Sequence, residues 1–178
     1  MGDRVYARVE IGGHVETIEE MQTLIDGIVV ECVSTLEGDD SVDDADDARS
    51  AFRHFVESQE LPTFCGTEVN YGVFESIDAA VSEIPGLGCC TNFDAGGGFG
   101  AGMKTVMPDG TEHHADRAGD DTGVSLSALM KARESDAPLA AIDALIEEAK
   151  LADGQCVPPF TVSPAVAAWL KIFGEKAA

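Results

Sequence analysis

Hydrophobic residues occupy alternate positions over residues 5–11, and polar residues fill most of the positions between them. This period of two predicts a half-buried strand, and the glycine pair at 12–13 predicts its end. Apolar residues then fall three or four positions apart over 17–26, which predicts an amphipathic helix. After the break signal Asp26-Gly27, the β-branched run at 28–33 favours a second strand over continuation of the helix.

The middle of the chain predicts a second helix, a strand and a hairpin. Ser41 followed by Asp44 resembles a capping box that opens an amphipathic helix. A strand over 64–73 and a short helix over 76–84 come next. The Pro-Asp-Gly turn at 108–110 lies between two candidate strands, which predicts a β-hairpin.

The last third of the chain is predicted to be helical, with helices over 126–133, after Asp136 and from Ser163 onward. Strands and helices mixed early, a hairpin and then helices predict an α+β fold, with helices packed on an antiparallel or mixed sheet. The apolar content of 44% is enough for one core, so we expect a single domain over residues 1–178. The break at 153–159 leaves open a loosely attached C-terminal helix over 160–176.

Charge changes this picture, because 33 acidic residues stand against 11 Lys and Arg, giving a formal net charge of −22. Seven of the eleven residues over 37–47 are acidic and none is basic. The first 90 residues hold 20 acids and four bases, whereas the remaining 88 hold 13 acids and seven bases. Adaptation to high salt should spread carboxylates evenly, while mimicry of a polyanion should concentrate them on one face.

These charges predict a non-enzymatic acidic interaction or inhibitor protein that mimics phosphate charge. Its partner would be the Lys/Arg-lined groove of a nucleic-acid-binding protein or complex, as for viral or mobile-element inhibitors of DNA-targeting defence systems. Direct nucleic-acid binding is disfavoured because the few bases cannot neutralise phosphates. The expected contacts are the acidic segment, two outlying acids and one aromatic anchor: Glu37, Asp39, Asp40, Asp43, Asp44, Asp46, Asp47, Asp120, Asp121 and Phe99.

Part of the acidic segment has a purely structural interpretation. Asp43 and Asp44 in a first helical turn would interact favourably with the helix dipole, by roughly 0.3–1 kcal/mol each. This interpretation does not cover the acids before the cap, or Asp46 and Asp47 one turn further on.

Two other classes of function stay open. The first is a protein of any function that is adapted to high salt. The second is a small enzyme or ligand-binding domain that uses the glycine-rich loop Gly96–Gly102 with Cys89, Cys90 and His114. The loop matches neither the Walker A motif nor the dinucleotide fingerprint, so a flexible surface loop is its simpler interpretation.

A metal site is a further alternative on the second strand of the hairpin. Glu112, His114 and Asp116 would share one face of that strand, with His113 on the other, and could bind a divalent ion. A solvated polar face is the simpler interpretation, and no cofactor or metal is predicted.

The remaining signals concern the cellular compartment. Five scattered cysteines, odd in number and without a Cys-x-x-Cys spacing, favour reduced thiols in a cytosol. The first residues lack the layout of a secretory signal, and no apolar run is long enough to cross a bilayer. We therefore expect a soluble cytoplasmic protein without membrane contact.

Overall fold

A computed structural model describes residues 4–35, 41–118, 121–152 and 157–172 of the chain. The strands are β1 (Arg4–Val15), β2 (Ser34–Thr35), β3 (Thr63–Asn70), β4 (Leu87–Phe93), β5 (Gly102–Val106), β6 (Glu112–Ala118), β7 (Asp121–Gly123) and β8 (Phe160–Val162). The helices are α1 (Ile18–Val30), α2 (Ala45–Ser58), α3 (Glu75–Glu83), α4 (Leu126–Arg133), α5 (Pro138–Ala152) and α6 (Pro164–Ile172).

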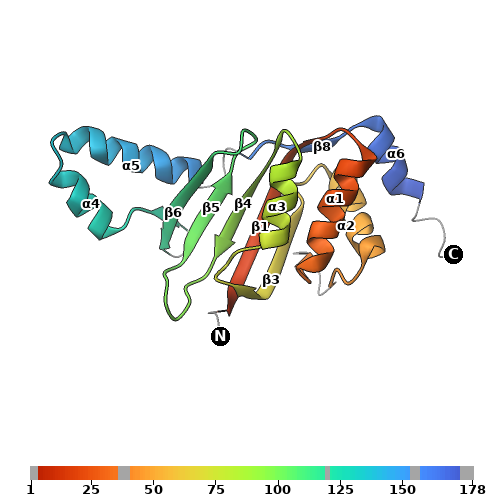
Figure 1. Cartoon of the computed structure of the whole chain (residues 1–178), viewed down its shortest axis with the longest axis horizontal. Coiled ribbons are helices and arrows are strands. Elements are labelled where there is room, and N and C mark those ends of the chain that lie inside the picture. Colours follow the sequence, from red (N-terminus) through yellow and green to blue (C-terminus); the bar gives the residue numbers. More distant parts are fainter. Residues whose placement is uncertain (1–3, 36–40, 119–120, 153–156, 173–178) are drawn as a thin grey trace.

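All eight strands form one sheet in the order β2-β3-β1-β4-β5-β6-β7, with β8 paired to the far end of β1 (Figure 1). Neighbouring strands are antiparallel except for β1 and β8, which run parallel. The predicted α+β fold with a mixed sheet and a helical C-terminal third is therefore confirmed. The predicted hairpin is also confirmed, as β5 and β6.

Helix α1 continues through Gly27 to Val30, so the strand predicted over 28–33 is wrong. The helix begins with a capping box in which Thr17 and Glu20 bond to each other's backbone. Gly27 faces α3, where a Cβ atom would lie 2.9 Å from the backbone oxygen of Ser76. Glycine here permits close packing of two helices and does not end the helix.

Strand β1 likewise runs through Gly12 and Gly13, which were predicted to end it. A Cβ atom on Gly12 would collide with the backbone oxygen of Pro158, and one on Gly13 with that of Gly86. Both glycines therefore allow neighbouring backbone to approach closely. The sequence did not predict β4, whose residues Leu87–Thr91 are all buried, because a strand covered on both faces shows no alternation.

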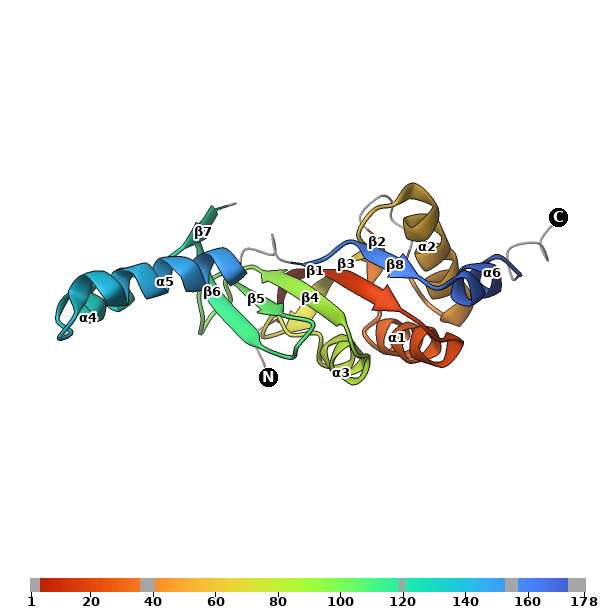
Figure 2. The same ribbon diagram turned by 90° about the horizontal axis from the view of Figure 1, so that it is seen from above.

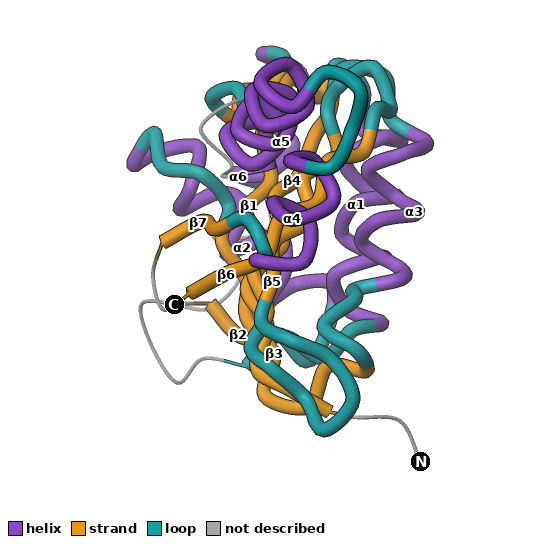
Figure 3. Tube along the Cα trace, turned by 90° about the vertical axis from the view of Figure 1, so that its left-hand side faces the viewer, coloured by secondary structure: helices purple, strands orange, loops and turns teal. Residues whose placement is uncertain are grey.

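Helices α1 and α3 lie side by side on one face of the sheet, as the end-on view shows (Figure 3). Helices α2 and α6 pack beside α1, near β8. In the core, the buried ring of Phe52 lies 5.5 Å from that of Phe64 and 5.7 Å from that of Phe160, between ring centroids. The C-terminal helix α6 buries Val166 and Leu170 against this core.

Helices α4 and α5 form an antiparallel pair that extends beyond the sheet at the β6 and β7 end (Figures 1 and 2). We call this pair, residues 126–152, the arm. The C-terminal part of α5 packs on β6, whereas α4 packs mainly on α5. Among the described residues, none of the helices is long and apolar enough to span a bilayer.

Candidate functional site

The acidic segment that the sequence singled out is only partly within the described residues. Its members Glu37, Asp39 and Asp40 lie outside them, as does Asp120. Asp121 begins β7 and pairs with Ala118 through the backbone. The described part of the segment is the start of α2, which carries its four remaining carboxylates.

Three of these four carboxylates have structural partners. Asp44 is the N-cap of α2, and its side chain accepts hydrogen bonds from the backbone N–H groups of Asp46 and Asp47 at 2.8 and 3.0 Å. The Asp46 carboxylate pairs with Arg49 at 3.0 Å, and that of Asp47 accepts from the backbone N–H of Asp43 at 3.3 Å. The prediction that Asp43 and Asp44 form the first helical turn is wrong, because Asp44 caps the helix and Asp46 and Asp47 occupy that turn. The capping box predicted at Ser41 is wrong for the same reason.

A second acidic surface lies on α1 and α3, where the exposed carboxylates form no ion pair with another described residue. Neither helix contains a Lys or Arg. Glu19 and Asp26 on α1 and Glu75 and Glu83 on α3 are exposed, and none forms an ion pair with another described residue. We call these four residues the acidic helical face. Helices α1 and α3 pack side by side on one face of the sheet, so both contribute exposed carboxylates to that side of the molecule (Figure 3).

Three of the four basic residues in the first half of the chain, Arg4, Arg8 and Arg49, have partners away from this face. Arg8 on β1 bonds to Glu10 at 2.7 Å, and Arg4 pairs with Glu68 at the end of the sheet. Arg49 on α2 is 8% exposed and stacks over the ring of Trp169, 4.2 Å from its centroid. None of the three contacts a carboxylate of the acidic helical face.

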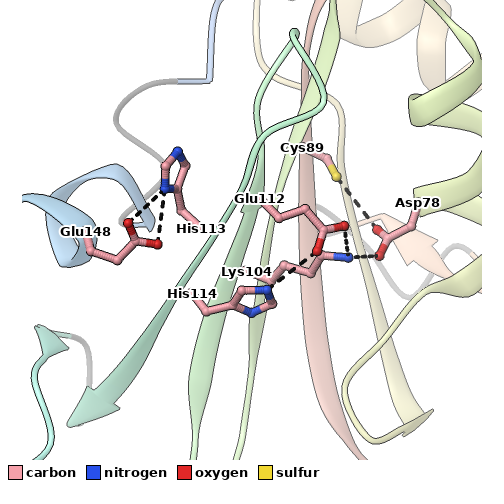
Figure 4. A network of polar contacts seen from close by, with 7 residues as sticks. All are labelled: Asp78, Cys89, Lys104, Glu112, His113, His114 and Glu148. Atoms are coloured by element: carbon pink, nitrogen blue, oxygen red, sulfur yellow. Dashed lines mark hydrogen bonds and ion pairs between the residues drawn. The ribbon is translucent and has the colours of Figure 1, made fainter. Parts of the chain in front are cut away.

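A second polar cluster surrounds Lys104 of β5 at the edge of α3 (Figure 4). The Lys104 ammonium group lies 2.9 Å from the Asp78 carboxylate of α3 and 3.0 Å from Glu112 of β6. Lys104 and Asp78 are mostly buried, with 18% and 14% of their side chains exposed. Burial lowers the pKa of Lys104, but hydrogen bonds to Asp78 and Glu112 outweigh it, so the net pKa is raised. Conversely, the hydrogen bond from Lys104 lowers the pKa of Glu112.

The thiol of Cys89 points into this cluster, with its sulfur 3.8 Å from Asp78 (Figure 4). Burial raises its pKa, and the nearby Asp78 charge raises it further. The thiol is therefore protonated at neutral pH, which makes it a weak nucleophile and a weak metal ligand. The cluster ties α3 to the central hairpin, and its chemistry fits a structural role.

The β6 residues considered for a metal site do share one face, as predicted. Glu112 and His114 are 3.6 Å apart, and the register also places Asp116 on this face. His113 points to the opposite face, where its Nδ1 lies 3.1 Å from the carboxylate of Glu148 on α5. Within the described residues, no group of three or more His, Cys, Asp or Glu side chains is arranged to hold a metal ion.

The glycine-rich loop is organised around aromatic rings. Phe99 packs against Phe93 and Tyr71, with ring centroids 6.0 and 5.9 Å apart. Gly102 leaves room for the Phe93 ring, since a Cβ atom there would lie 2.6 Å from it. The loop leads into strand β5 and not into a helix, so its backbone lacks the helix N-terminus that most phosphate cradles use. A role for Phe99 in partner binding stays a prediction.

Comparison with known proteins assigns no family, since no family model, no curated protein and no solved structure matches the chain.

Proposed function

We propose that this protein is a non-enzymatic acidic docking protein that binds the basic, nucleic-acid-binding surface of another protein, in competition with the nucleic acid. The observation that carries the proposal is the acidic helical face, where two adjacent helices expose carboxylates and contain no base. Carboxylates held on rigid helices can form charge-assisted hydrogen bonds with Arg in the way that phosphates do.

The distribution of charge along the chain supports docking over general salt adaptation. Residues 16–83, which include α1, α2 and α3, hold 18 acids and two bases. The arm holds five acids and three bases. A salt-adapted surface has no physical reason for this separation, whereas a surface that must meet a basic groove needs it.

The structure changes which carboxylates we expect to contact the partner. Three carboxylates at the start of α2 already have partners within the fold. Asp44 caps the helix, Asp46 pairs with Arg49, and Asp47 accepts a hydrogen bond from the backbone N–H of Asp43. Asp43 stays an expected contact beside them. The carboxylates of the acidic helical face form no ion pair with another described residue, and this face is therefore the centre of the proposed docking surface.

The proposal is tested by capturing proteins from source cells on the immobilised chain at low salt, with elution by rising salt or by added duplex DNA. We expect a basic nucleic-acid-binding protein that both treatments release, because charge holds it and DNA competes for the same groove. A captured partner that resists both treatments would contradict the proposal.

Two variants of equal charge locate the surface. The face variant carries Glu19→Lys, Asp26→Lys, Glu75→Lys and Glu83→Lys. The control variant carries Asp94→Lys, Asp116→Lys, Glu134→Lys and Asp136→Lys, four exposed acids away from α1 and α3. The face variant should bind the captured partner tenfold or more weakly, at about 1 kcal/mol or more per well-placed pair. Equal loss in both variants would show that net charge alone holds the partner.

A further inference from the structure

The arm exposes large apolar side chains that the rest of the described chain leaves uncovered. Leu126 and Met130 on α4 are 74% and 55% exposed, and Leu139 and Ile146 on α5 are 80% and 42% exposed. Ala132 is the one residue of α4 that is buried. Short helices need a packed apolar face for stability, so a pair with this little burial is suited to contact with another protein.

The charges of the arm make it complementary to itself. Helix α4 carries Lys131 and Arg133 and no acid. Helix α5 exposes Asp143 and Glu147, of which Glu147 also pairs with Lys150 at 2.7 Å. The whole arm, including the acids of the turn between the helices, has a net charge of −2 in a chain of −22. Two copies therefore repel each other least at their arms.

We propose that two copies of this chain associate through their arms, with α4 of one copy against α5 of the other. In a two-fold arrangement this contact is made twice, so each pair of opposite charges counts double. The basic end of α4 then faces the Asp143 carboxylate of the partner subunit, and the exposed apolar residues of both arms pack between them.

Other occupants fit this surface less well. A basic protein would meet Lys131 and Arg133, which are like charges. A polyanion would be attracted by two bases of α4 but repelled by the rest of a chain of −22. A second copy supplies both the apolar surface and the opposite charges that the arm requires.

The size of the arm predicts a weak dimer. Helix α5 has 15 residues and is about 22 Å long, and two helices side by side are about 20 Å wide. The contact is then roughly 440 Å² per copy, about half of a standard interface. An interface this small belongs to the weak, transient class, so we expect association only at micromolar or higher concentration. Salt should tighten the dimer by screening repulsion between the chains, whereas it should release the basic partner proposed above.

Sedimentation of the full chain tests the dimer over a range of about 1 to about 300 μM, chosen to cover micromolar and higher concentration. The natural chain should pass from monomer to dimer over this range, at lower concentration in high salt. A variant with Leu139→Glu and Ile146→Glu should associate at least tenfold more weakly. The control with Val30→Glu and Ile172→Glu adds the same charge at apolar sites that are 69% and 65% exposed outside the arm, and should stay within threefold of the natural chain.

Charge exchange tests the arrangement within the dimer. One variant carries Lys131→Glu with Arg133→Glu, and the other carries Asp143→Lys with Glu147→Lys. Each should self-associate more weakly than the natural chain, while a mixture of the two should form a mixed dimer at least threefold tighter than either alone. Three results would each overturn the proposal. The natural chain could stay monomeric at all concentrations, or the variant with Leu139→Glu and Ile146→Glu could lose no more affinity than its control with Val30→Glu and Ile172→Glu. The third is a mixture of the two charge variants that associates no more tightly than either alone.

Discussion

The helical half of the molecule, formed by α1, α2 and α3, and the arm distribute their apolar and charged residues in opposite ways. The helical half buries its apolar residues, among them Phe52 and Ile28, and turns carboxylates outward. The arm leaves Leu126 and Leu139 exposed and carries nearly balanced charges. The first region buries its own apolar residues and suits a contact held by charge, whereas the second suits a contact held by apolar surface.

This difference predicts the largest effect for core substitutions in the helical half. Phe52→Ala should lower the free energy of unfolding by about 3–5 kcal/mol, because it leaves a cavity between Phe64 and Phe160. Leu139→Ala in the arm should change it by less than about 0.5 kcal/mol, since that side chain is already exposed. Chemical denaturation of dilute, monomeric protein measures the free energy of unfolding of both variants. A comparable loss in the two would show that the arm is packed as tightly as the helical half.

The Lys104 cluster joins the helical half to the central hairpin, so breaking it should be the next largest effect. Lys104→Met leaves the Asp78 carboxylate largely buried and without its cation. We expect a loss of about 2–3 kcal/mol, less than for a fully buried pair because Glu112 is half exposed. Asp78→Asn in the same background should recover part of the stability. No recovery in the double variant would show that the two side chains do not act as a pair.

Salt should affect the two regions differently. Repulsion within the acidic helical face weakens as ions screen it, so the stability of the natural chain should rise by about 1 kcal/mol from low salt to about 1 M KCl. The face variant should show less than half of this rise. The control variant, which has the same net charge, should keep more of it; if both variants respond alike, the repulsion is not concentrated on α1 and α3.

The smallest expected effect is a loss of folding stability at low pH. The pKa of Glu112 is lowered in the folded protein, so its contribution is present above its ordinary pKa and is lost as the pH falls through the lowered value. The contribution is below about 1 kcal/mol because the side chain is half exposed. The natural chain should lose more stability than Glu112→Gln between about pH 5 and about pH 3. Parallel pH profiles for the two proteins would argue against the Lys104 bond as the cause of the shift.

The sequence predicted most elements with a regular apolar period, such as α3, α4 and the β5–β6 hairpin. The prediction failed where the role of a residue depends on packing against residues that are distant in the sequence. Gly27 resembles a helix break in sequence, yet it serves the contact of α1 with Ser76 of α3. Strand β4 has no alternation because both of its faces are buried.

Most of the candidate site was predicted from local charge density. That pattern identified the segment 37–47 and missed the acidic helical face, whose members are spread over two helices. The signal was present as the absence of bases, because residues 9–48 and 54–103 contain no Lys or Arg. The Lys104 cluster and the arm depend on pairing between distant segments, which one-dimensional patterns do not contain.

Amide hydrogen exchange of the chain alone and in complex with the captured basic partner locates the docking surface. We expect added protection on the exposed side of α1 and α3 and at the start of α2, with the arm unchanged at concentrations where the chain is monomeric. Protection confined to the arm, with α1 and α3 unaffected, would show that the partner does not dock on the acidic helical face.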